Sequence, residues 1–193
     1  MNDITDDELI RMYRNGDAEA FDTLFDRYHA SVYHFARTML GDSEGPEEVL
    51  QETFLAVART ADRYTPRDRF RAWLMRIVRN RCLNRIESRR VRRAVLAEGG
   101  WGMVEPASEG PAPSGQVETD EQTAIVRAAI AGLPDRQREA IALYAFEQMT
   151  YREIAEILEI PINTVKTLIH RARATLAKAL EPDHQQQEPR REL

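Results

Sequence analysis

The sequence has little of several features that define common classes of protein. It has one cysteine, Cys82, which excludes an intrachain disulfide and a CxxC zinc site. Its longest uninterrupted apolar run, Ala140 to Phe146, is seven residues, far short of the ~18 that a membrane span needs. The N-terminus is acidic and has no apolar stretch of the kind found in secretory signals. We therefore expect a soluble, cytoplasmic protein that does not associate with membranes.

The net charge of −5 argues at first against a nucleic-acid partner, but the charges are strongly segregated. Residues 1–62 hold 14 acidic and 5 basic side chains, and residues 94–126 hold six acids and no base. Between them, residues 63–93 hold 12 arginines against two acids, and residues 163–180 hold four bases and no acid. Because arginine forms bidentate contacts with phosphates and base edges, the two basic blocks predict contact with nucleic acid. A solvated arginine-rich surface is the alternative, although such dense charge repels itself without an anionic partner.

Helical periodicity dominates the first 93 residues, and no convincing strand pattern is present in the sequence. A first helix is expected to follow Thr5, whose spacing to Glu8 fits a capping box, and to end at Asn15. Further helices are expected at about 17–40, from about 46, and at about 68–90. Trp73 is expected mainly in the core because of its spacing to Phe70.

The composition changes after residue 93. Five of the nine glycines and three of the nine prolines lie between residues 94 and 115, which predicts a flexible linker. Helices are expected again from about 120, from Pro134 to about Phe146, at 151–158 and at 162–180. We therefore predict an all-α fold with an N-terminal helical bundle (1–93), a flexible acidic linker (94–121), a C-terminal helix-turn-helix domain (122–181) and a disordered tail (182–193).

The last two predicted helices have the spacing of a helix-turn-helix motif, in which the second helix enters the major groove of DNA. Its candidate DNA-contacting residues are Thr164, Lys166, Thr167, His170, Arg171 and Arg173. An ordinary helical hairpin with a basic outer face is the alternative. His170 has no second histidine or cysteine at metal-ligand spacing, so we expect no metal site.

Motifs in both halves resemble one known family. Region four of the extracytoplasmic-function (ECF) sigma factors of bacterial RNA polymerase is similar to Leu133-Pro134, Arg138, Thr150-Tyr151-x-Glu153-Ile154-Ala155, Ile160-Pro161-x-x-Thr164-Val165-Lys166 and His170-Arg171-Ala172-Arg173. Region two of the same family is similar to residues 47–55 and 70–81. Together the similar segments cover about 17–92 and 124–180, in the order that the family has them.

The resemblance implies a protein that binds core RNA polymerase and directs promoter-specific initiation, without a cofactor and without enzymatic activity. Region two would read and melt the −10 element, and region four would read the double-stranded −35 element. Family members are commonly held inactive by an anti-sigma factor, so such a partner is also expected.

In this family the helix that begins near Pro46 binds the coiled coil of the largest polymerase subunit. The resemblance therefore implies a polymerase contact at Glu48, Leu50, Gln51, Glu52 and Phe54. At least one of Leu50 and Phe54 is expected to be a core residue instead.

The arginine block is expected to hold the melted strand of the −10 element. Cationic grooves track single strands, and a pocket that accepts a flipped base completes such a site. We assign the pocket to the loop 62–69. The strand-contacting residues are expected to be Arg69, Arg71, Arg76, Arg79, Asn80, Arg81, Asn84 and Arg85.

Three positions depart from the family pattern. Glu159 and Asn163 stand where glycine is frequent, and Leu168 stands where arginine is frequent. Asparagine tolerates the left-handed conformation and caps helices, which makes Asn163 benign. The sequence leaves the effect of Glu159 and Leu168 on DNA recognition open.

Two other functions explain parts of the chain. A stand-alone helix-turn-helix regulator accounts for 134–180 but leaves the arginine block and the acidic helix near Pro46 without a role. A metal-dependent nuclease could be built on Asp42, Glu44, Glu47 and Glu48, but no histidine or lysine completes a recognisable catalytic group.

Overall fold

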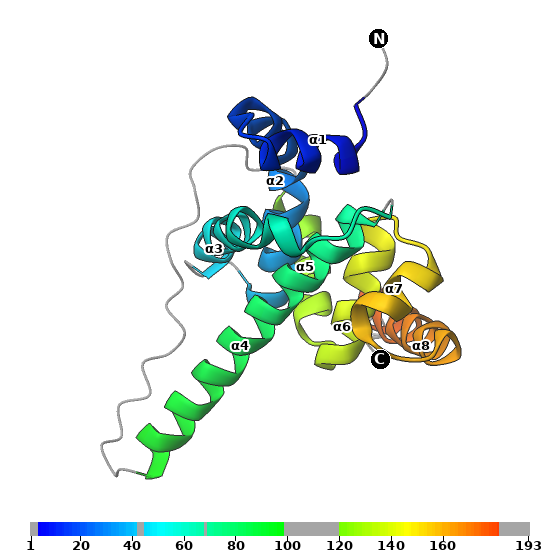
Figure 1. The fold of residues 1–193 in the computed structure, drawn as a ribbon. Helices are drawn as coiled ribbons and strands as arrows, with labels where there is room; N and C mark the ends of the chain where they lie inside the picture. Colours follow the sequence, from blue (N-terminus) through cyan, green and yellow to red (C-terminus); the bar gives the residue numbers. More distant parts are fainter. Residues whose placement is uncertain (1–3, 42–44, 68, 99–119, 182–193) are drawn as a thin grey trace, which may run out of the picture.

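The computed structural model describes residues 4–41, 45–67, 69–98 and 120–181, which form helices and no strand (Figure 1). The N-terminal half comprises α1 (Asp6–Arg14), α2 (Ala18–Leu40), α3 (Gly45–Thr60), the 3₁₀ turn η1 (Ala61–Arg63) and α4 (Phe70–Glu98). The C-terminal half comprises α5 (Asp120–Ala131), α6 (Asp135–Ile141), the π-helical turn η2 (Ala142–Phe146), α7 (Tyr151–Leu158) and α8 (Ile162–Leu180). The predicted all-α fold is confirmed.

Two helices begin at capping boxes, as the sequence predicts. The Thr5 amide donates to the Glu8 carboxylate at 3.0 Å, and the Glu8 amide donates back to the Thr5 hydroxyl at 3.3 Å. Thr150 and Glu153 repeat this arrangement at the start of α7, with distances of 2.7 and 3.3 Å. Each box satisfies two backbone donors that a helix N-terminus otherwise leaves unpaired.

The N-terminal half is built around α2, which packs against α1, α3 and α4. Its buried face carries Leu24, Val32 and Phe35, spaced by one or two helical turns. Trp73 is half-buried at the edge of this core, with its ring centroid 5.0 Å from that of Tyr64. Its packing role therefore agrees with the expectation from its spacing.

The two halves pack directly against each other. Figure 1 shows α7 beside the N-terminal part of α4, and α5, α6 and η2 all contact α2. The buried side chains of both halves belong to one connected hydrophobic core. The sequence predicted two domains joined by a linker, and nothing in it indicated this shared core.

Helix α4 continues to Glu98 rather than ending near Arg90, and its C-terminal part projects away from the body of the protein (Figure 1). The first five residues of the predicted linker, 94–98, are therefore helical. The physical reason is that 70–98 contains no glycine or proline, and the helix has no local signal to stop before Gly99. The rest of the linker up to residue 119, with Trp101, and the predicted tail at 182–193 lie outside the described residues.

The predicted helix from Pro134 to Phe146 changes character near its end. After α6 the backbone forms the wider π-helical turn, in which the Glu147 amide donates to the Ala142 carbonyl at 3.3 Å. Gln148 then adopts a positive φ of 50°. This wider turn positions Phe146 and Glu147 at the boundary between the halves.

The turn of the helix-turn-helix motif explains why glycine is frequent at position 159. Glu159 has φ 55° and ψ 44°, the left-handed conformation that ends α7. This conformation costs a residue with a Cβ roughly 1–2 kcal/mol, whereas glycine adopts it freely. Glu159 therefore holds local backbone strain.

We predict that Glu159→Gly raises stability. Glycine gives the unfolded chain more conformational entropy, which costs roughly 0.4–1 kcal/mol of stability. The relieved strain exceeds this cost, so the free energy of unfolding should rise by about 0.5–1 kcal/mol. Thermal unfolding followed by circular dichroism should show a rise of a few degrees. Glu159→Ala removes the same carboxylate but keeps the strain, so it should show no rise. Equal melting temperatures for the two variants would contradict this account.

Candidate DNA and polymerase interfaces

Helix α8 presents one apolar and one polar face. Val165, Ile169 and Ala172 are buried and hold the helix against α6 and α7. The opposite face is exposed and carries every residue predicted to contact the upstream element: Thr164, Lys166, Thr167, His170, Arg171 and Arg173. The spacing of the buried residues therefore leaves a basic surface that a DNA groove could approach.

Two of these side chains are held by neighbours. The Arg173 guanidinium lies over the Tyr144 ring, 4.8 Å from its centroid, which restricts its rotamers. The Thr167 hydroxyl donates to the Asn163 carbonyl at 2.9 Å. Leu168, by contrast, is half-buried and packs on the core, which gives a structural reason for an apolar residue at this position.

The candidate polymerase helix α3 has an exposed acidic face. Glu48 and Gln51 are exposed and Glu52 is half-buried, whereas Leu50 packs against the core. Phe54 is a core residue, only 5% exposed, with its ring centroid 4.8 Å from that of Phe25.

One apolar residue on α3 escaped the sequence analysis. Leu55 is 54% exposed and lies one turn after Gln51, on the same side of the helix. Val49, Thr53 and Val57 form the buried stripe of α3. Helical spacing places Leu55 outside this stripe, and this spacing was the sequence signal that Leu55 is exposed. Leu55 adds apolar area to the acidic face.

Two of the arginines predicted to bind DNA, Arg81 and Arg85, join α4 to α3 in this structure. Arg85 pairs with Glu48 and, at 2.7 Å, with Glu52, and Arg81 pairs with Glu52 at 2.9 Å. Burial alone would raise the pKa of Glu52, but the hydrogen bonds and charges of Arg85 and Arg81 outweigh it and hold the pKa below its ordinary value. These arginines therefore fix the acidic face in place.

Four other arginines of the block face the C-terminal half. Arg79 donates to the Glu139 carboxylate at 3.0 Å, and both side chains are buried. Arg71 contacts the carbonyl and, at 3.4 Å, the carboxylate of Glu147, which is also buried.

The other two pairs in this group are more exposed. Arg69 lies 3.1 Å from Glu156, and Arg76 lies 3.8 Å from Glu159. The remaining candidates of the block, Asn80 and Asn84, are exposed to solvent.

The loop assigned to base capture is anchored by α1. The Tyr64 hydroxyl donates to the Asp7 carboxylate at 2.6 Å, and Arg14 donates to the Asp62 carbonyl. Burial, together with the Asp7 carboxylate, raises the pKa of Tyr64 well above its ordinary value. Residue 68 lies outside the described residues.

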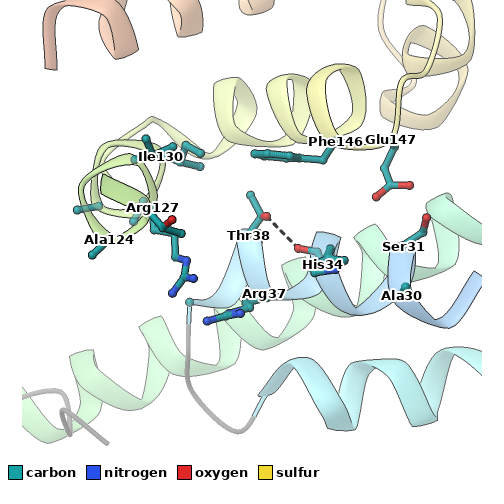
Figure 2. Close-up of a pocket in the computed structure, with 15 residues that line it drawn as sticks. Ala30, Ser31, His34, Arg37, Thr38, Ala124, Arg127, Ile130, Phe146 and Glu147 are labelled. Atoms are coloured by element: carbon teal, nitrogen blue, oxygen red, sulfur yellow. Dashed lines mark hydrogen bonds between the residues drawn. The ribbon is translucent and has the colours of Figure 1, made fainter. Parts of the chain in front are cut away.

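A groove of about 760 Å³ lies where the two halves meet. Figure 2 shows α2 forming one wall, with His34 and Thr38, and α5 and η2 forming the other, with Ile130 and Phe146. Phe146 is 50% exposed, so the groove offers apolar area to a partner. Arg37 and Arg127 come from opposite walls at one end of the groove, as Figure 2 shows.

Among the described residues, no group of three or more histidine, cysteine, aspartate or glutamate side chains is placed to hold a metal ion. Asp42 and Glu44 of the nuclease alternative lie outside the described part of the chain. None of the helices in the described part of the chain combines the length and apolarity that a membrane span requires.

Comparison with known proteins decides the family. The family model for sigma-70 region 2 matches residues 24–92, and that for sigma-70 region 4 matches residues 123–176. The chain is 32% identical to the ECF RNA polymerase sigma factor SigW of Bacillus subtilis over 176 residues, which cover 89% of this chain and 94% of SigW. The chain belongs to the ECF sigma factors.

Solved structures agree with this assignment. The sigma factor is similar to CnrH in complex with the cytosolic domain of CnrY, at 28% identity and a TM-score of 0.68, over 92% of this chain and 98% of that one. It is also similar to the sigma factor RpoE of Bartonella quintana in complex with the anti-sigma factor NepR, at 25% identity and a TM-score of 0.67, over 84% and 98% of the two chains. The match to region 2 as well as region 4 disfavours a stand-alone helix-turn-helix regulator.

We predict that Arg85→Met raises the pKa of Glu52 toward its ordinary value of 4.5, because it removes the largest favourable contact of that carboxylate. A carboxyl group whose pKa is lower in the folded than in the unfolded chain stabilises the fold at pH values above its unfolded-state pKa. This stabilisation is lost as the pH falls through the folded-state pKa. The variant should therefore lose less stability than the wild type as pH falls below 4.5.

Carbon-detected NMR titration of the glutamate carboxyls measures this shift. Glu8 is an internal control, because hydrogen bonds from the Thr5 backbone and side chain lower its pKa and Arg85 plays no part. The account is wrong if the Glu52 midpoint is the same in the two proteins.

Proposed function

We propose that this sigma factor binds core RNA polymerase in the cytoplasm and directs it to promoters, and that it performs no catalytic step itself. The observation that carries the proposal is the pairing of two exposed faces of opposite character on one chain. The acidic and partly apolar face of α3 suits a basic protein surface, and the basic face of α8 suits DNA.

We assign the upstream contact to the N-terminal half of α8. Thr164, Lys166 and Thr167 lie in its first two turns, where a recognition helix reaches base edges. His170, Arg171 and Arg173 follow on the exposed side, and Arg173 is oriented by Tyr144. Arginine and lysine in such positions read guanine edges or bind phosphates.

We assign the polymerase contact to Glu48, Gln51, Glu52 and Leu55, with Leu50 and Phe54 supporting the helix from beneath. Arg81 and Arg85 act in this contact as positioning residues through Glu48 and Glu52. We assign the −10 contact to Arg69, which directly precedes α4, and to Arg71, Arg76, Arg79, Asn80 and Asn84 on that helix.

We also propose a protein inhibitor as a partner, since the structural neighbours include a sigma factor in complex with an anti-sigma factor. The groove between α2 and η2 fits a helical segment of such a protein. Apolar side chains on that segment would cover Phe146 and Ile130, and acidic ones would face Arg37 and Arg127.

Transcription in vitro tests the proposed function. Core polymerase with the purified chain and fragmented genomic DNA should give transcripts that start at defined positions and that are absent without the chain. Sequence-specific DNA binding by the chain alone, with no chain-dependent transcript, would favour a stand-alone regulator instead.

We predict that Leu55→Glu weakens binding to core polymerase at least about tenfold, because it removes an apolar contact worth about 1.5–3 kcal/mol and adds a desolvated charge. Val95→Glu is the matched control, since Val95 is also exposed, at 62%, but lies on α4 away from the acidic face. Fluorescence anisotropy of the labelled chain titrated with core polymerase gives both affinities. Equal affinities for the two variants would remove Leu55 from the interface.

We predict that Lys166→Ala and Arg171→Ala each cost roughly 1–3 kcal/mol of holoenzyme binding to the upstream element if the side chain reads a base, and less if it binds only phosphate. A base reader should relax specificity at one position, whereas a phosphate contact should weaken all sequences and flatten the salt dependence. Lys178→Ala, in the last turn of the same helix, is the control. Unchanged footprints for both variants would show that α8 does not read the upstream element.

A further inference from the structure

Helix α1 holds the loop that we assign to base capture at two points. The Tyr64 hydroxyl donates to the carboxylate of Asp7, in the first turn of the helix, at 2.6 Å. Arg14, in the last turn, donates to the Asp62 carbonyl, and its Nε lies 3.5 Å from the Asp62 carboxylate. Asp7 and Arg14 are about two helical turns apart, so both contacts lie on one face of α1, roughly 10 Å from each other. The helix therefore fixes the start of the loop at both Asp62 and Tyr64.

Helix α1 is itself fixed on the core of the N-terminal half. Leu9 and Ile10 are buried in that core. The Asp6 carboxylate accepts hydrogen bonds from Arg27 and from the Tyr28 hydroxyl, both on α2. Two successive aspartates of α1 therefore contact two different elements, the central helix and the loop. Because α1 packs on α2 through both apolar and charged groups, it holds the loop in a fixed position relative to the core.

Tyr64 connects α1 to the loop and to α4. Its side chain is buried, and its ring centroid lies 5.0 Å from that of Trp73 and 5.8 Å from that of Phe70, at the start of α4. Burial raises the pKa of the Tyr64 hydroxyl, and hydrogen bonds with the backbone of Arg67 and of Arg69 act against this rise. The hydroxyl therefore keeps its proton at neutral pH and lies between the α1 carboxylate and the backbone of the loop.

The loop between these fixed ends faces solvent. Thr65, Pro66 and Arg67 are exposed, so the core does not hold their side chains in place. Sites on loops are less precise than sites on helices, and a binding site tolerates displacements of only about 0.5 Å. Discrimination between bases by this loop therefore depends on the contacts at its two ends.

We propose that Asp7 and Arg14 are positioning residues for base capture, and that α1 sets the specificity at the −10 element without touching DNA. Through Tyr64 and Asp62 they hold the loop in the shape that accepts the flipped base. A chain that lacks these contacts should still bind core polymerase and the upstream element, but it should discriminate less between bases at −10. This inference rests on the proposed function of the loop.

Binding of the holoenzyme to single-stranded DNA tests the proposal. The probes are a fluorescent oligonucleotide with the non-template −10 sequence of a promoter mapped by the transcription assay, and a set of variants with one base changed at each position. The measured quantity is the discrimination ratio, which is the affinity for the promoter sequence divided by the affinity for a variant. A merely destabilised chain has a smaller active fraction and binds all probes less well, which leaves this ratio unchanged. A displaced loop lowers it.

Asp7→Ala should lower the discrimination ratio about fivefold at one or two positions, because it removes a hydrogen bond to a charged group. Asp7→Asn keeps an oxygen that can accept from Tyr64, so it should restore most of the ratio. Asp22→Ala is the matched control, since it removes the same charge at an exposed position on α2. If Asp7→Ala has the same ratio as this control, the proposal is wrong.

Tyr64→Phe tests whether the effect passes through this hydrogen bond. It keeps the buried ring and removes the hydroxyl, so it should lower the ratio at least as much as Asp7→Ala. The two changes combined should have no more effect than Tyr64→Phe alone, since both remove one interaction. Additive effects would show that Asp7 does not act through Tyr64 and would overturn its assignment.

Arg14→Ala removes the second attachment and should also lower the ratio. Its control is Arg11→Ala, which removes the same charge at an exposed position of the same helix. Equal ratios for these two variants would overturn the assignment of Arg14. Circular dichroism reports whether each variant remains helical, and Tyr64→Phe decides if Asp7→Ala does not fold. A wild-type holoenzyme without discrimination at −10 would contradict the proposed function, whereas discrimination that survives in all these variants contradicts only the positioning by α1.

Discussion

The arrangement of this sigma factor depends on two carboxylates that the fold removes from water. Glu139 and Glu147 lie in the C-terminal half, and each finds its arginine in the N-terminal half. Because an unpaired buried charge is costly, these pairs set the position of the two halves relative to each other more strictly than apolar contact alone. The shared hydrophobic core around them supplies non-directional attraction.

Six arginines of the block form two groups with different contacts. Arg81 and Arg85 turn toward α3 and hold Glu48 and Glu52 in the acidic face. Arg69, Arg71, Arg76 and Arg79 contact glutamates of the C-terminal half. Helix α4 therefore borders both the proposed polymerase surface and the proposed strand-binding surface.

The helices, their capping boxes and the exposed face of α8 follow from local patterns, which is why the sequence predicts them well. Thr5 and Thr150 act within three residues of themselves, and the burial of Val165 and Ile169 follows from helical spacing. The contact between the halves depends on pairs far apart in the chain. From the sequence, Glu139 is indistinguishable from a solvent-exposed acid of an amphipathic helix. Its contact with Arg79 depends on the tertiary fold.

The separation of the two halves in the unmodified sigma factor, measured before and after it binds core polymerase, tests the central claim most directly. With dyes on α2 and α8, the account predicts a compact free chain and a holoenzyme in which the halves lie far enough apart to span two promoter elements. The same short separation in an active holoenzyme would contradict it, because the arginines would then remain bound to glutamate while the promoter is read.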